Sequence, residues 1–174
     1  MSRRILSKAV AVGGLALGLF LLAGPEGFAL AGKKEDAAKH LTDLKAGKDA
    51  KSQVYALEEL AKIGQIQKSA IKDAVPEMMK ALESKDATVR AAAAKSVGMI
   101  DPDPKEVIPI LVKMMTEDKD EAAKMGAIAG LGQMGENAKD AVKDLRKVVA
   151  DEDKKSKLGR AAQQALKVIV VKKK

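Results

Sequence analysis

A pattern of twelve residues that recurs along the chain constrains its fold more than any other feature. The pattern occupies residues 89–100 and returns, with substitutions, at residues 52–63, 123–134 and 158–169. The copies are offset by 34 to 37 residues. Such a spacing is typical of stacked supersecondary units, each of which buries its apolar face against its neighbours. The sequence therefore predicts a repeat protein.

A second amphipathic segment precedes each copy of the pattern, so each repeat is predicted to contain two helices. Apolar residues in these segments recur at the i, i+3, i+4, i+7 spacing that places them on one face of a helix. The sets are Val75, Met78, Met79 and Leu82 in the second repeat, Ile108, Leu111, Val112 and Met115 in the third, Val142, Leu145 and Val149 in the fourth, and a thinner Ala38, Leu41 and Leu44 in the first. We expect an all-α fold with repeats at about residues 35–69, 70–101, 102–136 and 137–170.

Capping and turn residues agree with these boundaries. Asp103 followed by Pro104 is typical of a helix start, and Asn137 is expected to cap the first helix of the fourth repeat in the same way. Pro76 and Pro109 share one repeat position, which predicts a bend in each of these first helices. The second helices of the first three repeats are expected to end at Gly64, Asp101 and Gly135.

The recurring pattern resembles the second helix of HEAT repeats, especially the short variety related to the phycobilisome-lyase repeats. That helix reads roughly V-R-x-x-A-A-x-A-L-G-x-I-G, and the fullest match is Val89, Arg90, Ala93, Ala94, Val97, Gly98 and Ile100. The other copies match at Ala56, Leu60, Ile63 and Gly64, at Lys124, Ala127, Leu131, Gly132, Met134 and Gly135, and at Ala162, Ala165, Leu166 and Ile169. The resemblance implies an α-solenoid of about four antiparallel helix pairs. Tetratricopeptide arrays share the period but rely on aromatic residues, of which residues 32–174 contain only Tyr55.

The first thirty-one residues have the composition of a secretory signal peptide. Arg3, Arg4 and Lys8 precede an uncharged run over residues 9–23, and the small residues of Ala29-Leu30-Ala31 suit a signal peptidase. We expect cleavage after Ala31, which leaves a domain of residues 32–174 in the periplasm or outside the cell. A retained membrane anchor is the alternative, but the run is shorter than the ~20 residues that span a bilayer. The paired arginines partly match the twin-arginine export motif, although the apolar segment favours the general secretory route.

One charge pattern also recurs at the start of the second helices. Asp86 lies four residues before Arg90, and Asp120 lies four before Lys124, a spacing that brings acid and base together on a helix surface. The resemblance to HEAT repeats implies a further role for these residues, as a ladder that links neighbouring repeats. The first and fourth copies lack the basic residue, so the ladder is expected only in the middle two repeats.

Candidate chemistry in this sequence is sparse. Cysteine is absent and His40 is the only histidine, so no cysteine nucleophile and no zinc site of the usual His and Cys ligands is expected. Iron-binding hydroxylases of the short HEAT type carry His-Glu pairs, which this chain lacks, and phycobilin lyase activity has no support beyond the repeat itself. Residues 32–174 also contain no Trp or Phe to stack on a base, which argues against a nucleic-acid partner. We therefore expect no enzyme activity, metal or cofactor.

A second apolar stripe on the second helices is the candidate partner-binding surface. It lies opposite the predicted core residues and includes Val54, Leu57, Ala91, Ala94, Met125 and Ile128. Two interpretations stay open. Neighbouring helices bury the stripe, which we favour because central solenoid helices are often apolar all round, or it lines a groove that accepts the apolar face of a partner.

The sequence as a whole favours an exported, non-catalytic scaffold that binds an unidentified protein. An accessory or chaperone-like subunit of an exported enzyme is the first alternative. The second is weak binding to an anionic membrane through Lys172, Lys173 and Lys174, although lysines at this position also complement the dipole of a preceding helix. Removal of residues 1–31 leaves 29 basic and 23 acidic residues, and this mixed surface gives no basic stripe typical of nucleic-acid binding.

Overall fold

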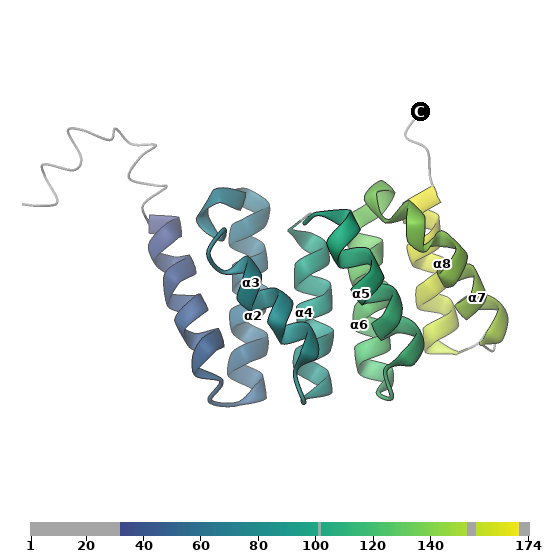
Figure 1. Ribbon diagram of the computed structural model, residues 1–174, viewed down its shortest axis with the longest axis horizontal. Helices are drawn as coiled ribbons and strands as arrows, with labels where there is room; N and C mark the ends of the chain where they lie inside the picture. Colours follow the sequence, from purple (N-terminus) through teal and green to yellow (C-terminus); the bar gives the residue numbers. More distant parts are fainter. Residues whose placement is uncertain (1–31, 101, 153–155, 171–174) are drawn as a thin grey trace, which may run out of the picture.

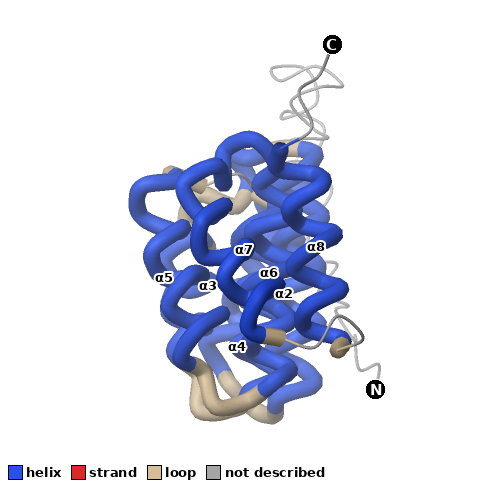
Figure 2. Tube along the Cα trace, turned by 90° about the vertical axis from the view of Figure 1, so that its right-hand side faces the viewer, coloured by secondary structure: helices blue, strands red, loops and turns tan. Residues whose placement is uncertain are grey.

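The computed structural model describes residues 32–100, 102–152 and 156–170, and these residues form helices and loops without a strand (Figures 1 and 2). A first helix covers residues 32–46. The following elements are α2 (Ala50–Ile66), η1 (Lys68–Ala70), α3 (Val75–Lys80), η2 (Ala81–Glu83), α4 (Ala87–Met99), α5 (Pro104–Glu117), α6 (Glu121–Met134), η3 (Gly135–Ala141), α7 (Val142–Asp151) and α8 (Lys157–Val170). The predicted signal peptide and the three C-terminal lysines lie outside the described residues.

The helices stack as an all-α, HEAT-like solenoid. The second helices α2, α4, α6 and α8 stand side by side in chain order, and each contacts the next (Figure 1). The first helices α3, α5 and α7 cover one side of this row, and the helix over residues 32–46 lies at the opposite end of the molecule from α8 (Figure 1). Stacking in chain order means that each repeat depends on its neighbours to bury its apolar residues.

The helix starts follow from local side-chain chemistry. Asp49 and Asp86 cap α2 and α4 by accepting hydrogen bonds from backbone N–H groups of the first turn. Asp103 caps α5 by accepting from the Lys105 N–H, with Pro104 at the first helical position, as the sequence predicts. Gly135 ends α6 with a positive φ of 55°, a conformation that costs glycine little.

Two sequence predictions about the first helices are wrong. Asn137 lies inside η3, and Ala141 occupies the N-cap of α7, because a 3₁₀ segment precedes the α-helix there. Pro76 stands at the start of α3, whereas Pro109 lies inside α5. Since α3 begins only after η1 and a turn, the two prolines do not bend equivalent helices.

One continuous apolar core runs through all the repeats. Its largest fully buried side chains come from both helix layers and include Leu57, Leu60, Met78, Val89, Val97, Leu111, Leu131, Leu145 and Ile169. Many of the remaining buried residues on the second helices are Ala and Gly. Small residues bury little area each, but they let neighbouring helix backbones approach closely. This close approach determines how much of the candidate partner-binding stripe is exposed to solvent.

Candidate partner-binding surface

The row of second helices is tightest between α4 and α6. A Cβ atom placed on Gly98 would lie 2.6 Å from Gly130 Cα, and one placed on Gly126 would lie 2.5 Å from the Ala91 carbonyl oxygen. Real Cβ atoms do not approach a neighbouring backbone this closely. The backbones of α4 and α6 are therefore in direct contact, and glycine is required on both helices.

This contact explains where the six predicted partner-binding residues lie. Leu57 and Ala94 are 0% exposed and Ile128 is 1% exposed. Val54, Ala91 and Met125 are half-buried. The stripe faces the next second helix of the row, with Ala91 against Gly126 and Ala94 against Gly130. As a correction, Leu57, Ala94 and Ile128 belong to the core. For these three residues the favoured interpretation, burial by neighbouring helices, holds.

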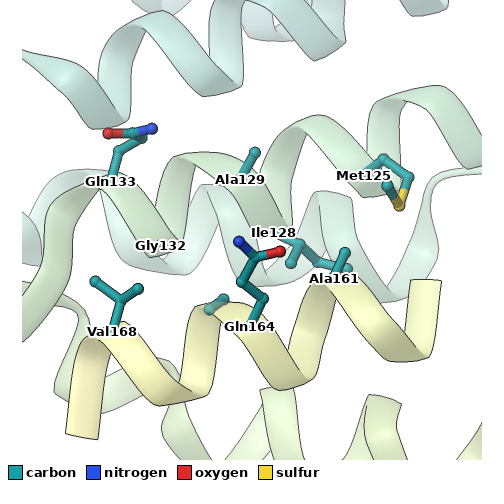
Figure 3. Close-up of a pocket in the computed structure, with 9 residues that line it drawn as sticks. Met125, Ile128, Ala129, Gly132, Gln133, Ala161, Gln164 and Val168 are labelled. Atoms are coloured by element: carbon teal, nitrogen blue, oxygen red, sulfur yellow. The ribbon is translucent and has the colours of Figure 1, made fainter. Parts of the chain in front are cut away.

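The spacing changes between α6 and α8. A Cβ atom placed on Gly132 would lie 3.4 Å from Ala165 Cβ, an ordinary van der Waals distance. The wider separation leaves a groove of about 400 Å³ between the two helices (Figure 3). Two of the predicted residues, Met125 and Ile128, line it, together with Ala129, Gly132, Gln133, Ala161, Gln164, Ala165 and Val168.

The chemistry of the groove is apolar and uncharged. None of its nine lining residues is charged. Gln133 and Gln164 supply its polar side-chain groups, and Figure 3 shows them on facing helices. Val168 is 53% exposed, although valine in a folded protein is more often buried. The groove can therefore accept apolar side chains and a few hydrogen bonds, but it has no acid, base or nucleophile for catalysis.

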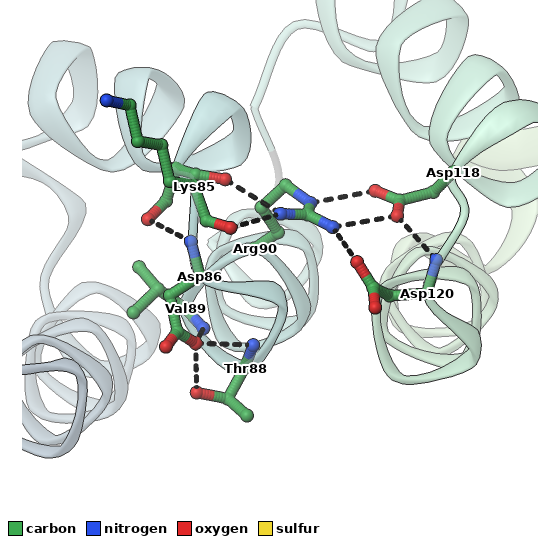
Figure 4. Close-up of polar contacts among 8 residues, drawn as sticks. Lys85, Asp86, Thr88, Val89, Arg90, Asp118 and Asp120 are labelled. Atoms are coloured by element: carbon green, nitrogen blue, oxygen red, sulfur yellow. Dashed lines mark hydrogen bonds and ion pairs between the residues drawn. The ribbon is translucent and has the colours of Figure 1, made fainter.

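A second polar feature links the two middle repeats. Arg90 reaches from α4 to the loop before α6, where its Nε and Nη2 donate to the Asp118 carboxylate, both at 2.8 Å, and Nη2 also lies 2.8 Å from Asp120 Oδ2 (Figure 4). Nη1 donates to the backbone oxygens of Ser84 and Lys85. The guanidinium thus joins the second repeat to the third.

This cluster differs from the predicted pairs four residues apart. Asp86 caps α4 and makes no ion pair with Arg90, which turns instead to Asp118, a residue that the sequence analysis did not single out. The Asp120 carboxylate accepts a hydrogen bond from Arg90 and makes no side-chain cap bond at the start of α6. Among the described residues, the predicted ladder therefore consists of one link, between the second and third repeats.

The hydrogen bonds that they accept lower the pKa values of Asp49, Asp86 and Asp118. Hydrogen bonds from Arg90, opposed by partial burial, lower the pKa of Asp118. The cap bonds from Ser52 lower the pKa of Asp49, and those from Thr88 lower the pKa of Asp86. Contact with Asp118 raises the pKa of Arg90. All four groups are charged at neutral pH, which suits a structural role.

Other sites in the described part of the chain offer little chemistry. No three or more His, Cys, Asp or Glu side chains there lie close enough together to hold a metal ion. His40 packs edge to face on Tyr55, with ring centroids 5.8 Å apart, and so joins the helix over residues 32–46 to α2. None of the described helices has the length and hydropathy needed to cross a membrane.

Comparison with protein families agrees with the architecture. A family model described as HEAT repeats matches residues 38–121 and 101–167. The chain belongs to the HEAT-repeat family. HEAT repeats are in general protein-interaction modules without catalytic activity. A search of curated proteins found no match to this HEAT-repeat chain.

Several groove residues were missed by the sequence analysis. Ala129, Gln133, Ala161, Gln164 and Val168 line the groove but lie beside the predicted stripe. The signal that could have found them is a run of uncharged side chains on an exposed helix face, where Ala122, Met125, Ala129 and Gln133 follow one another on α6. Exposure of that face depends on the wider α6–α8 spacing, which no local pattern predicts.

Proposed function

We propose that this HEAT-repeat protein is an exported, non-catalytic scaffold that binds another protein through the groove between α6 and α8. The observation that carries the proposal is an accessible groove of about 400 Å³ with no charged lining residue. Export rests on the charged, apolar and small-residue segments of residues 1–31. HEAT-repeat membership supports a protein as the partner.

The dimensions of the groove favour one kind of occupant. On α6 its lining runs from Met125 to Gln133, about 12 Å at the rise of an α-helix. This length matches two helical turns, so a partner helix would place apolar side chains four residues apart against Met125, Ala129 and Val168. Gln133 and Gln164 would then hydrogen-bond polar groups at the edge of that helix. The expected partner segment is an amphipathic helix with an uncharged face.

A photo-crosslinking amino acid introduced at Gln164 tests this assignment, because that side chain is exposed and lines the groove. The matched control is the same group at Ala150, an exposed residue of α7 outside the groove. We expect crosslinks from position 164 to converge on one partner peptide of amphipathic helical pattern, and none to that peptide from position 150. Equal crosslinking at both positions, or crosslinks from 164 to charged unrelated peptides, would exclude the groove as the binding site.

The identity of the crosslinked protein also separates the alternatives for function. If the partner is an exported enzyme, the protein is an accessory subunit, and the purified chain should change the activity or stability of that enzyme in proportion to occupancy. A partner without enzymatic activity would favour a simple scaffold.

A further inference from the structure

The face of α8 that points away from α6 has an unusual composition for a solenoid. The repeat offset places Arg160, Gln163 and Lys167 at the positions that Met125, Ile128 and Gly132 occupy on α6. On α4 the same positions are Ala91, Ala94 and Gly98, which pack against the next second helix. The stripe that stacks the inner repeats is therefore polar and basic on α8, and no described helix covers it.

Next to α7, this polar stripe borders apolar residues of α8. Leu166 is only partly buried, whereas Leu60, Val97 and Leu131 at the same repeat position are 0% exposed. Val170 is 51% exposed. Leu166 and Val170 line a shallow hollow of about 330 Å³ between α7 and α8, with Arg146 and Lys167 as its two cations. We name these four residues the end hollow.

Charge is also concentrated in this part of the chain. Residues 32–134 contain 17 basic and 17 acidic residues, whereas residues 135–174 contain 12 basic and 6 acidic residues. The entire net charge of residues 32–174 thus lies in residues 135–174, half of it in the tail Lys172, Lys173 and Lys174. Among the described residues, neither Arg146 nor Lys167 forms an ion pair, so both cations are available to a ligand.

A further repeat from a second copy does not suit this face. The close stacking of α4 on α6 requires glycine, since even a Cβ atom on Gly98 would lie 2.6 Å from Gly130 Cα. Lys167 takes the place of Gly98 on α8, so a long side chain occupies the space that a stacked helix would need. Nucleic acid does not suit the end hollow either, because its centre is aliphatic and offers no ring for base stacking.

We propose that the end hollow binds an acidic segment of a partner protein. An aliphatic side chain of that segment packs on Leu166 and Val170, and carboxylates on either side of it pair with Arg146 and Lys167. The positive field of the last repeat attracts such a segment from solution. This site lies on the opposite side of α8 from Ala161, Gln164 and Val168, so it is independent of the groove proposed above.

The test uses the purified chain and a fluorescently labelled synthetic peptide in which two leucines are flanked by glutamates. Fluorescence anisotropy measures the affinity at low and at physiological salt. Arg146→Glu with Lys167→Glu should weaken binding by about tenfold or more, because two attractions become repulsions. Val170→Ser should weaken it about threefold through loss of apolar contact. Added salt should weaken binding to the unaltered protein.

Matched controls separate the end hollow from net charge and from the groove. Lys51→Glu with Lys105→Glu changes the net charge equally at exposed helix starts far along the chain, and should leave the affinity within about twofold. Ala129→Glu alters the α6–α8 groove and should also leave it unchanged. Equal loss in the Lys51 and Lys105 variant, or no peptide binding at all, would overturn the proposal. Binding to phosphatidylglycerol vesicles without peptide binding would replace it with a membrane contact.

Discussion

Replacement of Gly126 by alanine tests the backbone contact between α4 and α6. At an ordinary helix position this change stabilises a protein by up to ~1 kcal/mol, because alanine has the higher helix propensity. Here the added methyl group would lie 2.5 Å from the Ala91 carbonyl oxygen and 2.8 Å from its carbonyl carbon. Contacts between carbon atoms are optimal at ~3.5–4.0 Å, so the two helices would have to separate by about 1 Å.

The cost of that separation outweighs the gain in propensity. Overpacking of a close-packed site typically costs ~1–3 kcal/mol, and the separation would also loosen the contact of Gly98 with Gly130. We expect Gly126→Ala to lower the free energy of unfolding by about 1–2 kcal/mol, measured by urea denaturation with far-ultraviolet circular dichroism.

Gly132→Ala is the matched control on the same helix. Its methyl group would lie 3.4 Å from Ala165 Cβ and should therefore leave stability unchanged or raise it by up to ~1 kcal/mol. If Gly126→Ala stabilised the protein as much as Gly132→Ala, the backbone contact between α4 and α6 would be refuted.

The polar cluster and the terminal segments give four further predictions. Arg90→Met leaves the Asp118 carboxylate, which is 11% exposed, without its cation. It should lower the free energy of unfolding by about 2 kcal/mol in the same assay, a cost between those of breaking an exposed and a buried ion pair. An unchanged denaturation midpoint would contradict the link between the two repeats. Because the pKa of Asp118 is lowered on folding, its carboxylate stabilises the protein fully above the ordinary pKa of 3.8, and this stabilisation is lost as the pH falls through the lowered pKa. Asp118→Asn should therefore reduce the dependence of the free energy of unfolding on pH in the acid range. An unaltered pH dependence would contradict the stabilising role of this carboxylate. Intact-mass analysis of exported protein should give a chain that begins at Gly32, and a chain that retains residues 9–23 would contradict cleavage after Ala31. Deletion of Lys172 to Lys174 should abolish any binding to anionic vesicles at low salt, and vesicle binding that survives the deletion would contradict a membrane contact through these lysines.

Local patterns predicted the repeat architecture well. The helix pairs follow from apolar spacing, and Asp103 with Pro104 starts α5 as expected. These features depend on residues within one or two turns of each other, which a single sequence displays directly.

The candidate site was harder to predict because it depends on the spacing between repeats. An apolar stripe is visible in sequence, but whether a neighbour covers it is decided by the next helix: glycine brings α4 against α6, and a wider gap leaves the groove beside Gly132. Arg90 illustrates the same limit. The i, i+4 spacing on a helix predicts an ion pair between Arg90 and Asp86. The stacking of the repeats instead brings Asp118, 28 residues away in sequence, to the guanidinium.

The affinity of a groove variant for the crosslinked partner tests the proposed function most directly. Ala129 is exposed and lines the groove, so Ala129→Glu places a charge in the apolar site without disturbing the core. Isothermal titration with the amphipathic partner peptide should show binding weakened by at least about tenfold in Ala129→Glu, and unchanged binding in the Ala150→Glu control. Equal affinity of the two variants, with both folded, would contradict a partner site between α6 and α8.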